Sequence, residues 1–415
     1  MKKILLFGPE VTDFLNPLAS KLKDIGYTVD LIENRKIPRN NKSIIESYSK
    51  ILDYQEIEGK RITFAEIIRY LFKREFLDSY FKEIFINRLE GKCHIIKSFK
   101  NCLSHHLLKE RFSPILNNYD IINFHSLSPG TLSFVKYINP DKKIILSFWG
   151  SDLYQINGIK NYYEQFEAIK RADTITVMSY EMELMVLAKF GSGLKNKIVR
   201  ALLGIKDEMF DMIDEVKKSG VDLNFLEKYN IPHNKIKITI CYCGNPICNH
   251  LLILDELEKI DNIKKEKIHL LVPMTYGNFS REYLEEVIQR LNRAKISYTV
   301  FEKFLSLEEL VKLRVSSDIM IMMNNSDALS GSVNEALYAD NLLISAIWLP
   351  YSPFRLEQIF FLETDFTKLC ETVSYSIDNF GKIKRQLVNN SNNIKKLGAV
   401  NPNLQKWINI IDSLQ

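Results

Sequence analysis

Short apolar runs alternate with segments of helical period along the whole chain. Eleven runs have the length and composition of buried strands, and they cover 3–7, 28–32, 121–125, 143–148, 174–179, 197–203, 236–243, 268–273, 297–302, 318–323 and 342–346. Strands separated by helical crossovers are typical of parallel sheets. A polar helical connector over 206–229 divides the runs into six and five. The pattern therefore predicts an α/β protein with two parallel sheets.

The chain length favours the same division. A chain of 415 residues is too long for one core, because single cores stop growing at about 250–300 residues. We expect two doubly wound, Rossmann-like domains facing each other across a cleft. The first covers 1–205 with a helical insert at 60–112, and the second covers 206–385. The stretch 386–415 has helical periods and is expected to pack back on the first domain as a helix.

The insert at 60–112 departs from the alternation. Its apolar residues recur every three or four positions, which predicts a strongly amphipathic helix with an aromatic face; they include Phe64, Ile67, Leu71, Phe76, Tyr80, Phe81, Ile84 and Phe85. Residues 60–111 hold twelve Lys/Arg against six Asp/Glu, an excess larger than the net charge of +5 of the whole chain. Two interpretations follow. The helix packs on the first domain, or its basic aromatic surface contacts anionic membrane or a lipid-linked acceptor.

The composition is that of a folded globular protein. With 46% hydrophobic and 26% charged residues, the chain is unlike disordered proteins. No run approaches the ~18 apolar residues of a spanning helix, and the apolar run at 4–7 is shorter than the roughly 7–15 residues of a signal-peptide core. We expect a cytoplasmic protein, peripheral on the inner face of the plasma membrane if the insert contacts lipid.

Six cysteines in so long a chain do not form a disulfide framework. Cys241, Cys243 and Cys248 lie close in sequence, but their spacing differs from the C-x-x-C pairs of zinc sites. The first two also fall in the predicted strand 236–243, so we expect buried, reduced thiols. No Asp-x-Asp sequence is present to hold a metal-chelated diphosphate. The sequence therefore predicts neither a metal nor another cofactor.

The segment 326–335 follows the predicted strand 318–323 and is the strongest candidate for chemistry. Its Ser330-Gly331-Ser332 turn opens a helix, and a helix N-terminus presents free N–H groups and a positive dipole end that suit a diphosphate. Glu335, about one turn into that helix, could then accept hydrogen bonds from ribose hydroxyls. The competing interpretation is an ordinary strand-to-helix turn with Ser330 as its cap and Glu335 on the surface.

The spacing of Asp327 and Glu335 resembles the E-x7-E signature of the GT-B glycosyltransferase family that includes the sucrose and glycogen synthase-like enzymes. The resemblance implies that Glu335 holds the donor ribose and that Asp327 lies beside the sugar. Asp327 is shorter than the Glu of the signature.

A second resemblance covers roughly 238–355 and is to the dTDP-N-acetylfucosamine:lipid-linked acceptor transferases. It is carried by Gly244-Asn245, Asn249-His250, the segment 272–277, Phe304-Leu305 and the 326–335 loop. It implies that Gly244 and Asn245 approach the diphosphate through backbone amides. It also implies that Leu305 contacts the nucleobase, and that Thr275, Tyr276 and Gly277 flank the donor. His250 is a further donor-binding candidate, and its alternative role is a helix N-terminal histidine with no ligand.

The first-domain segment 147–154 resembles the H-G-x-D turn of the same families, with Trp149 in place of the histidine, followed by Gly150 and Asp152. Inversion at an anomeric carbon needs a base for the acceptor hydroxyl, and Asp152 could be that base. Its alternative role is a helix N-cap. His125, at the end of the preceding predicted strand, is the second candidate base. Gly8, after the first strand, is expected at the acceptor side of the cleft.

These features together predict a metal-independent glycosyltransferase of hexosyl or N-acetylaminosugar type. The donor would be a nucleotide-diphosphate sugar, and the acceptor a glycan or lipid-linked precursor of a surface polysaccharide. Two alternatives stay open: a non-hydrolysing nucleotide-sugar epimerase, which shares the two-domain plan, and a non-catalytic GT-B partner subunit. No aromatic-basic RNA-binding signature is present, so nucleic acid is not an expected partner.

Overall fold

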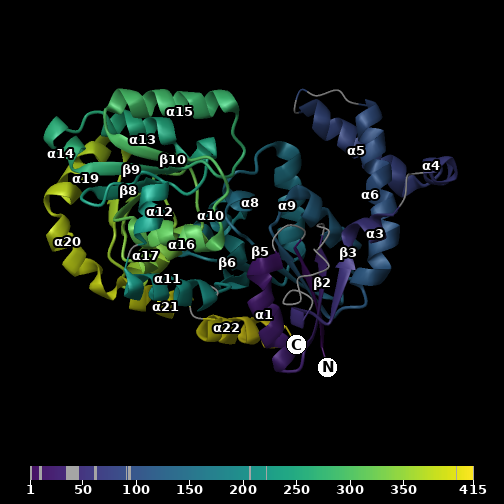
Figure 1. The fold of residues 1–415 in the computed structure, drawn as a ribbon. Helices are drawn as coiled ribbons and strands as arrows, with labels where there is room; N and C mark the ends of the chain where they lie inside the picture. The colour runs from purple at the N-terminus through teal and green to yellow at the C-terminus, as the bar shows by residue number, and fades with distance from the viewer. Residues whose placement is uncertain are drawn as a thin grey trace. The chain divides into compact units, whose positions relative to one another are not determined.

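The computed structural model describes residues 2–8, 12–33, 46–59, 63–89, 91, 95–204, 207–220, 222–398 and 400–414. The chain forms two compact units, Met1–Leu203 with Val400–Gln415, and Gly204–Ala399. Figure 1 shows the helices and strands of each. The expected domain boundary at 205/206 falls outside the described residues, as do 60–62, 90 and 92–94 of the insert.

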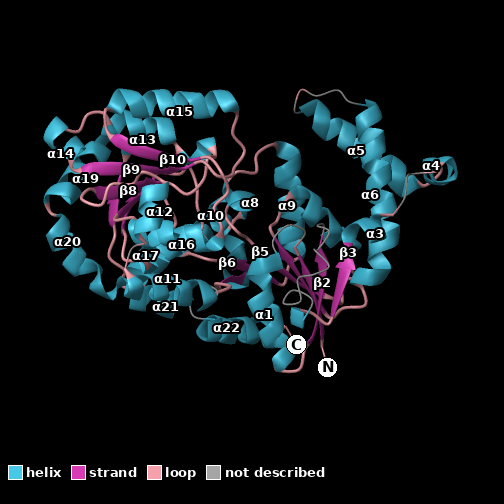
Figure 2. Cartoon of the chain, in the orientation of Figure 1, coloured by secondary structure: helices cyan, strands magenta, loops and turns pink. Residues whose placement is uncertain are grey.

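The first unit is built on a seven-stranded sheet in the order β3-β2-β1-β4-β5-β6-β7, drawn in magenta in Figure 2. Every neighbouring pair is parallel. The strands are β1 (Lys3–Phe7), β2 (Thr28–Glu33), β3 (Lys50–Asp53), β4 (Ile121–His125), β5 (Lys143–Ser147), β6 (Thr174–Val177) and β7 (Ile198–Arg200). The strand order reverses between β1 and β4. In such sheets ligands bind at the carboxyl ends of the strands at this reversal.

The first unit contains the following helices, of which α22 comes from the C-terminal end of the chain and α4 and α5 pack on other helices. They are α1 (Thr12–Asp24), α3 (Tyr54–Glu58), α4 (Phe64–Leu71), α5 (Arg74–Leu89), α6 (Ile95–Leu116), α7 (Pro129–Leu132), η1 (Ser133–Tyr137), α8 (Ser151–Tyr154), α9 (Ile159–Arg171), α10 (Tyr180–Phe190), η2 (Ser192–Lys197) and α22 (Val400–Ser413). Trp407 packs in the core formed by α1, β1 and β2. Its indole Nε1 donates to the carbonyl of Leu202 at 2.9 Å.

The second unit repeats the plan with a six-stranded sheet in the order β10-β9-β8-β11-β12-β13, again parallel throughout. Its strands are β8 (Ile236–Ile240), β9 (Ile268–Pro273), β10 (Ser297–Phe301), β11 (Ile319–Met322), β12 (Leu342–Ala346) and β13 (Leu362–Thr364). Here the order reverses between β8 and β11.

Helices flank both faces of the second sheet (Figure 1). They are α11 (Asp207–Ser219), α12 (Leu223–Lys228), η3 (Pro246–Cys248), α13 (His250–Leu257), α14 (Asn262–Glu266), α15 (Arg281–Ala294), α16 (Leu307–Ser316), α17 (Gly331–Tyr338), α18 (Ser352–Leu356), η4 (Phe366–Lys368), α19 (Leu369–Asp378), α20 (Phe380–Gln386), η5 (Leu387–Asn389) and α21 (Asn390–Gly398). Because α21 packs on α17, the second unit extends to Ala399. The segment returning to the first unit therefore begins at Val400 and is shorter than the expected 386–415.

The two doubly wound sheets confirm the predicted fold class, and two differences have physical causes. The described residues contain two strands that the pattern missed, β3 and β13, which are short and partly polar. The predicted strand 236–243 ends early, at Ile240. Cys241 takes a left-handed backbone conformation with φ of 55°, which turns the chain out of the sheet.

The insert is not one helix but the three helices α4, α5 and α6. A capping box between Thr63 and Glu66 starts α4, which ends before Phe72. The three helices share a small core of Tyr70, Phe76, Cys102, Leu103 and Leu107, and α6 packs on η1 and α3 of the first unit. Other apolar side chains stay exposed, among them Phe72, Phe81 and Phe85. In the described part of the chain no helix combines the length and apolarity needed to cross a bilayer.

Candidate functional site

The loops that follow β8, β9 and β11 meet at the strand reversal of the second unit. The Gly244 amide donates to the carbonyl of Tyr276 at 2.8 Å, which joins the first two loops. The Asn249 side-chain amide donates to the carbonyl of Met323 at 2.7 Å, which joins the first loop to the third. The three segments singled out from the sequence thus form one site.

The third loop opens helix α17 as predicted. Ser330 is its N-cap residue with extended backbone, and its side chain makes no capping bond. The amides of Gly331 and Ser332 follow in the first turn, where no preceding turn can supply an acceptor. They are available to an anion, and the helix dipole favours negative charge at this end.

Asp327 holds this loop in place through hydrogen bonds of its side chain. Its side chain is buried, and Oδ2 accepts hydrogen bonds from the Ser330 amide at 3.1 Å and the Tyr351 hydroxyl at 2.8 Å. Burial raises the pKa of the carboxyl group against the effect of these donors. The geometry places Asp327 as a support for the turn, whereas the resemblance implied a contact with the donor sugar.

Glu335 is held in place by a buried arginine. Oε2 accepts a hydrogen bond from Arg314 Nε at 3.1 Å, and the side chains are only 13% and 3% exposed. The other oxygen, Oε1, lies 3.5 Å from the position that a Cβ atom at Gly331 would occupy. One carboxylate oxygen is therefore anchored and the other lies beside the free amides, as contact with a ribose next to a diphosphate requires.

Sequence reasoning missed Arg314. The sequence did indicate that Arg314 is buried. Arg314 follows Val311 by three positions in α16 and so falls on the apolar, buried face of that helix. A buried Arg is rare without a partner. The pattern showed that a partner was needed but could not identify it as Glu335.

Tyr276 and Gly277 lie beside the start of α17. The Tyr276 ring is half exposed, and burial raises its pKa to about 12. Gly277 has φ of 122°, and a side chain there would begin 2.8 Å from the Asn245 nitrogen, so only glycine fits. Thr275 is partly exposed next to them.

Four further residues predicted to bind the donor make their contacts within the protein. The Gly244 amide, implied to approach the diphosphate, already donates to Tyr276. Asn245 caps η3 by accepting from the Ile247 amide at 3.2 Å. Leu305 is buried in a core cluster with Phe301 and Leu313.

His250 is the fourth of these candidates. It is fully buried, with Nδ1 3.1 Å from the Tyr283 hydroxyl, and burial lowers its pKa to about 4. The ring is therefore neutral at physiological pH and carries no charge to offer a phosphate.

The first-unit candidates gather at the carboxyl ends of β1, β4 and β5. Asp152 is 4% exposed, and its carboxylate accepts amide hydrogen bonds from Leu127 at 2.7 Å, Trp149 at 2.9 Å and Gly150 at 2.8 Å. It is not the N-cap of α8, because Gly150, with φ of 119°, holds that position. Asp152 ties the loops after β4 and β5 together, and burial raises its pKa.

His125 is fully buried beside Trp149. Its Nδ1 accepts a hydrogen bond from the indole Nε1 of Trp149 at 3.2 Å, and the ring also contacts Trp407. Burial lowers its pKa to about 3, so the ring is neutral and only weakly basic. Gly8 lies against it, since a Cβ at Gly8 would be 3.6 Å from the Cβ of His125.

The first unit also contains a cavity of about 450 Å³ that the sequence did not indicate. Helices α5 and α6 of the insert form one wall, and η1 and α9 form the other. The cavity is lined by both charge signs: Lys82, Lys109, Lys136 and Lys160 face it together with Glu75, Glu83, Glu164 and Glu167. Burial raises the pKa of Glu164, and a 3.1 Å ion pair joins Lys160 to Glu83.

Two parallel, doubly wound units with the same strand reversal and a final helix returning to the first unit define the GT-B glycosyltransferase fold. Solved structures with this architecture match the whole chain. A glycosyltransferase from Rickettsia africae is 15% identical, with a TM-score of 0.68 over 100% of this chain and 98% of its own. Anabaena Alr3699/HepE in complex with UDP and glucose is 10% identical, with a TM-score of 0.68 over 100% of both chains.

Sucrose-phosphate synthase from Thermosynechococcus elongatus is 11% identical, with a TM-score of 0.66 over 100% of this chain and 99% of its own. No protein-family profile matches the sequence, and no protein of curated function is detectably similar to it. At these identities the likeness establishes the fold.

Proposed function

We propose that this chain is a glycosyltransferase that uses a nucleotide-diphosphate sugar as donor. The observation that carries the proposal is the start of α17, where two free amides lie beside a carboxylate anchored by Arg314. The diphosphate would bind the amides of Gly331 and Ser332, and Oε1 of Glu335 would accept from the ribose hydroxyls. The GT-B fold and the UDP complexes of HepE support this assignment.

Transfer would proceed without a catalytic metal. As the sugar leaves, negative charge develops on the departing diphosphate, and fixed amides and a helix dipole stabilise such charge without reorganisation. The Tyr276 hydroxyl, on the loop joined to this site through the Gly244 amide, would be a further donor. UDP-glucose is the first donor to test, because HepE has been solved in complex with it. The hexosyl or N-acetylaminosugar type of the natural donor belongs to this proposal.

The acceptor would bind the first unit. The charged cavity between the insert and the domain body offers ammonium groups for a phosphate and carboxylates for sugar hydroxyls. The exposed aromatic side chains of α5 lie on the same insert. Together they favour a lipid-linked acceptor of surface polysaccharide synthesis, approached by peripheral contact of 60–112 with the inner face of the plasma membrane.

Asp152 and His125 would position the acceptor. Both are buried, and the Asp152 carboxylate is occupied by three backbone amides. Asp152 therefore keeps the β4 and β5 loops in one arrangement, and a fixed arrangement lowers the cost of orienting an acceptor.

Binding and product analysis test the proposal. Calorimetric titration of the full chain with UDP, dTDP, GDP and CMP sugars should give binding to at least one, competed by the matching nucleoside diphosphate. Incubation of that donor with membrane lipid extract should yield glycosylated lipid, and incubation with donor alone should leave the sugar configuration unchanged. Binding of none would refute the donor site, and an epimerised nucleotide sugar would replace transfer with epimerisation.

A further inference from the structure

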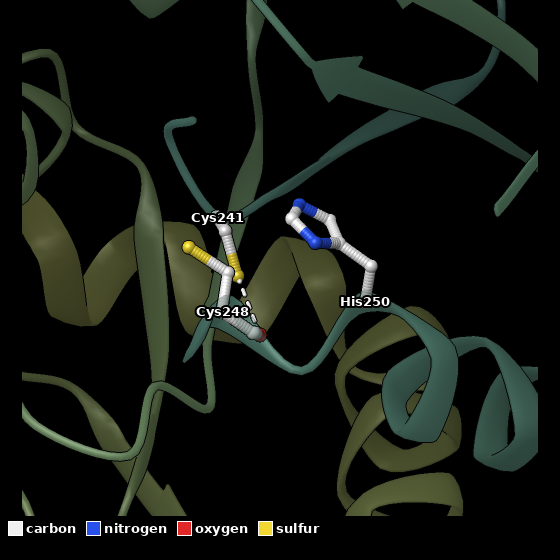
Figure 3. Close-up of side chains that lie close together, drawn as sticks. All are labelled: Cys241, Cys248 and His250. Atoms are coloured by element: carbon white, nitrogen blue, oxygen red, sulfur yellow. Dashed lines mark hydrogen bonds between the residues drawn. The ribbon is translucent and has the colours of Figure 1, made fainter. Parts of the chain in front are cut away.

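The loop after β8 brings three thiols and an imidazole together in the interior of the second unit. The Sγ atoms of Cys241 and Cys248 and a ring nitrogen of His250 all lie within 4.8 Å of one another (Figure 3). The Sγ of Cys243 lies 3.7 Å from the Sγ of Cys248. Cys241, Cys248 and His250 are fully buried, and Cys243 is 5% exposed.

These separations are close to those of a tetrahedral zinc site. Two sulfurs about 2.3 Å from a tetrahedral zinc ion lie about 3.8 Å apart, and a sulfur and an imidazole nitrogen lie about 3.6 Å apart. The Cys243–Cys248 distance already matches the first value. The contacts among Cys241, Cys248 and His250, which lie within 4.8 Å, need to shorten by up to about 1.2 Å. The Cys243 sulfur lies outside that group and also has to move toward it by side-chain rotation.

From this geometry we propose that Cys241, Cys243, Cys248 and His250 bind a structural zinc ion. The three thiols would each release one proton to solvent and bind as thiolates, and the histidine would bind as a neutral imidazole. Three Cys and one His complete the four positions of a closed, structural site. No position remains for substrate, so this ion takes no part in the transfer chemistry.

The surroundings of the cluster suit an imidazole ligand. The Tyr283 hydroxyl lies 3.1 Å from His250 Nδ1. Such hydrogen bonds orient metal ligands and fix the histidine tautomer. With Nδ1 held by Tyr283, His250 Nε2 is buried and has no hydrogen-bond partner. A metal bond at Nε2 would satisfy this otherwise costly polar atom.

The zinc ion would stabilise the loop of the proposed donor site that contains Gly244 and Asn245. Cys243 and Cys248 flank the segment Gly244–Asn245, and Gly277 packs directly on its backbone. A loop tied at both ends to one ion loses little freedom when nucleotide binds. This inference goes beyond the proposed function and does not depend on it, since the ion would bind whether or not the loop holds a nucleotide.

Cobalt substitution in the full chain tests the site. Reduced, chelator-treated protein should bind one equivalent of Co²⁺, with thiolate-to-cobalt charge transfer in the near ultraviolet and the intense visible bands of tetrahedral cobalt. Zn²⁺ should displace the cobalt, bleach the spectrum and raise the melting temperature. The variants Cys241→Ser, Cys248→Ser and His250→Gln should lose or strongly reduce the charge-transfer band. Cys370→Ser, which alters a partly exposed thiol elsewhere in the second unit, should retain it.

The proposal can be refuted by measurements on the unmutated chain alone. The test therefore does not depend on whether every variant folds. Failure of the reduced protein to bind cobalt would refute the site, as would cobalt bound without thiolate charge transfer. A Cys243–Cys248 disulfide, found by mass spectrometry in protein purified without metal, would also refute it. Zinc binding without any nucleotide-sugar binding would leave this inference standing and refute the proposed function.

Discussion

The pair Arg314 and Glu335 is the residue-scale feature on which the donor site depends. Both side chains are withdrawn from water, so neither charge has a solvent shell to replace its partner. Breaking a buried ion pair by removing one partner is strongly destabilising, because the remaining charge stays buried.

A double-mutant cycle measures this pair. Arg314→Met should destabilise the second unit by about 3–5 kcal/mol, and Glu335→Gln should cost less because Gln still accepts a hydrogen bond. The double variant should be more stable than the sum of the two losses predicts, by about 0.5–3 kcal/mol. Denaturant unfolding followed by circular dichroism gives the four values. Strict additivity would show that the pair is not coupled.

The neutral His125 should make the first unit sensitive to acid. Its pKa is lowered to about 3 by burial, whereas in the unfolded chain it is about 6.5. Its contribution to stability is therefore complete above pH 6.5 and is lost as the pH falls toward 3. The free energy of unfolding should drop by up to about 1.4 kcal/mol per pH unit between pH 6 and 4 from this residue.

The comparison with His125→Gln isolates this effect. The variant should lack that part of the slope in urea unfolding curves taken between pH 6 and 4. His233→Gln, which changes an exposed histidine, should keep it. Equal slopes in all three proteins would contradict the assignment of His125 as a buried neutral base.

At the scale of elements, the apolar strands were predictable, but two of the four described edge strands, β3 and β13, were not. Central strands of parallel sheets are buried on both faces and read as apolar runs, as in 268–273 and 342–346. The edge strands β3 and β13 carry polar residues and are three or four residues long. The helical insert was recognised by its period, but the break between α4 and α5 was not, because the apolar spacing continues through Leu71, Phe72 and Phe76.

The loops that carry the candidate site could be predicted from the sequence, but the contacts between these loops could not. Strand ends carry the ligand loops in this fold, so Gly244, Tyr276 and the turn at 330–332 were found from the pattern alone. Which amides stay free depends on contacts between loops far apart in sequence, such as Gly244 with Tyr276. The same limit hid the partner of Glu335.

The insert should mediate contact with anionic lipid. Phe81 and Phe85 of α5 are each 62% exposed, so replacing them removes membrane-binding area without opening a core. The double variant Phe81→Ser/Phe85→Ser should bind vesicles containing anionic lipid at least tenfold more weakly in a sedimentation assay, because each buried aromatic contributes about 1.5–3 kcal/mol. Its melting temperature should stay within a few degrees of the parent.

Phe304→Ser is the matched control, since Phe304 is 79% exposed in the second unit. It should leave vesicle binding unchanged. Undiminished binding of the double variant would show that lipid contact, if any, does not use this face of the insert.

At the scale of the whole molecule, the last helix ties the ends of the chain into one unit. Trp407 and Ile411 of α22 are buried in the core of α1, β1 and β2. Trp407→Ala should destabilise the first unit by about 3–5 kcal/mol, while the second unit, with its own core, should keep its transition. Because two units need not unfold together, calorimetry should show one transition shifted and one unchanged.

A shift of both transitions by the same amount would contradict this division. The second unit of the Trp407→Ala variant should also bind nucleotide with unchanged affinity, because all the proposed donor residues lie within Gly204–Ala399.

The central claim is that the start of α17 and Glu335 hold a nucleotide-diphosphate sugar, and calorimetric titration with UDP-glucose tests it most directly. Glu335→Ala should weaken binding by about 1–3 kcal/mol, because a charge-assisted hydrogen bond to ribose is lost. Glu308→Ala removes an exposed carboxylate of α16 that forms an ion pair with Lys312, and this variant should bind UDP-glucose as the unmodified chain does. Equal affinity of the Glu335→Ala variant and the unmodified chain would contradict the account.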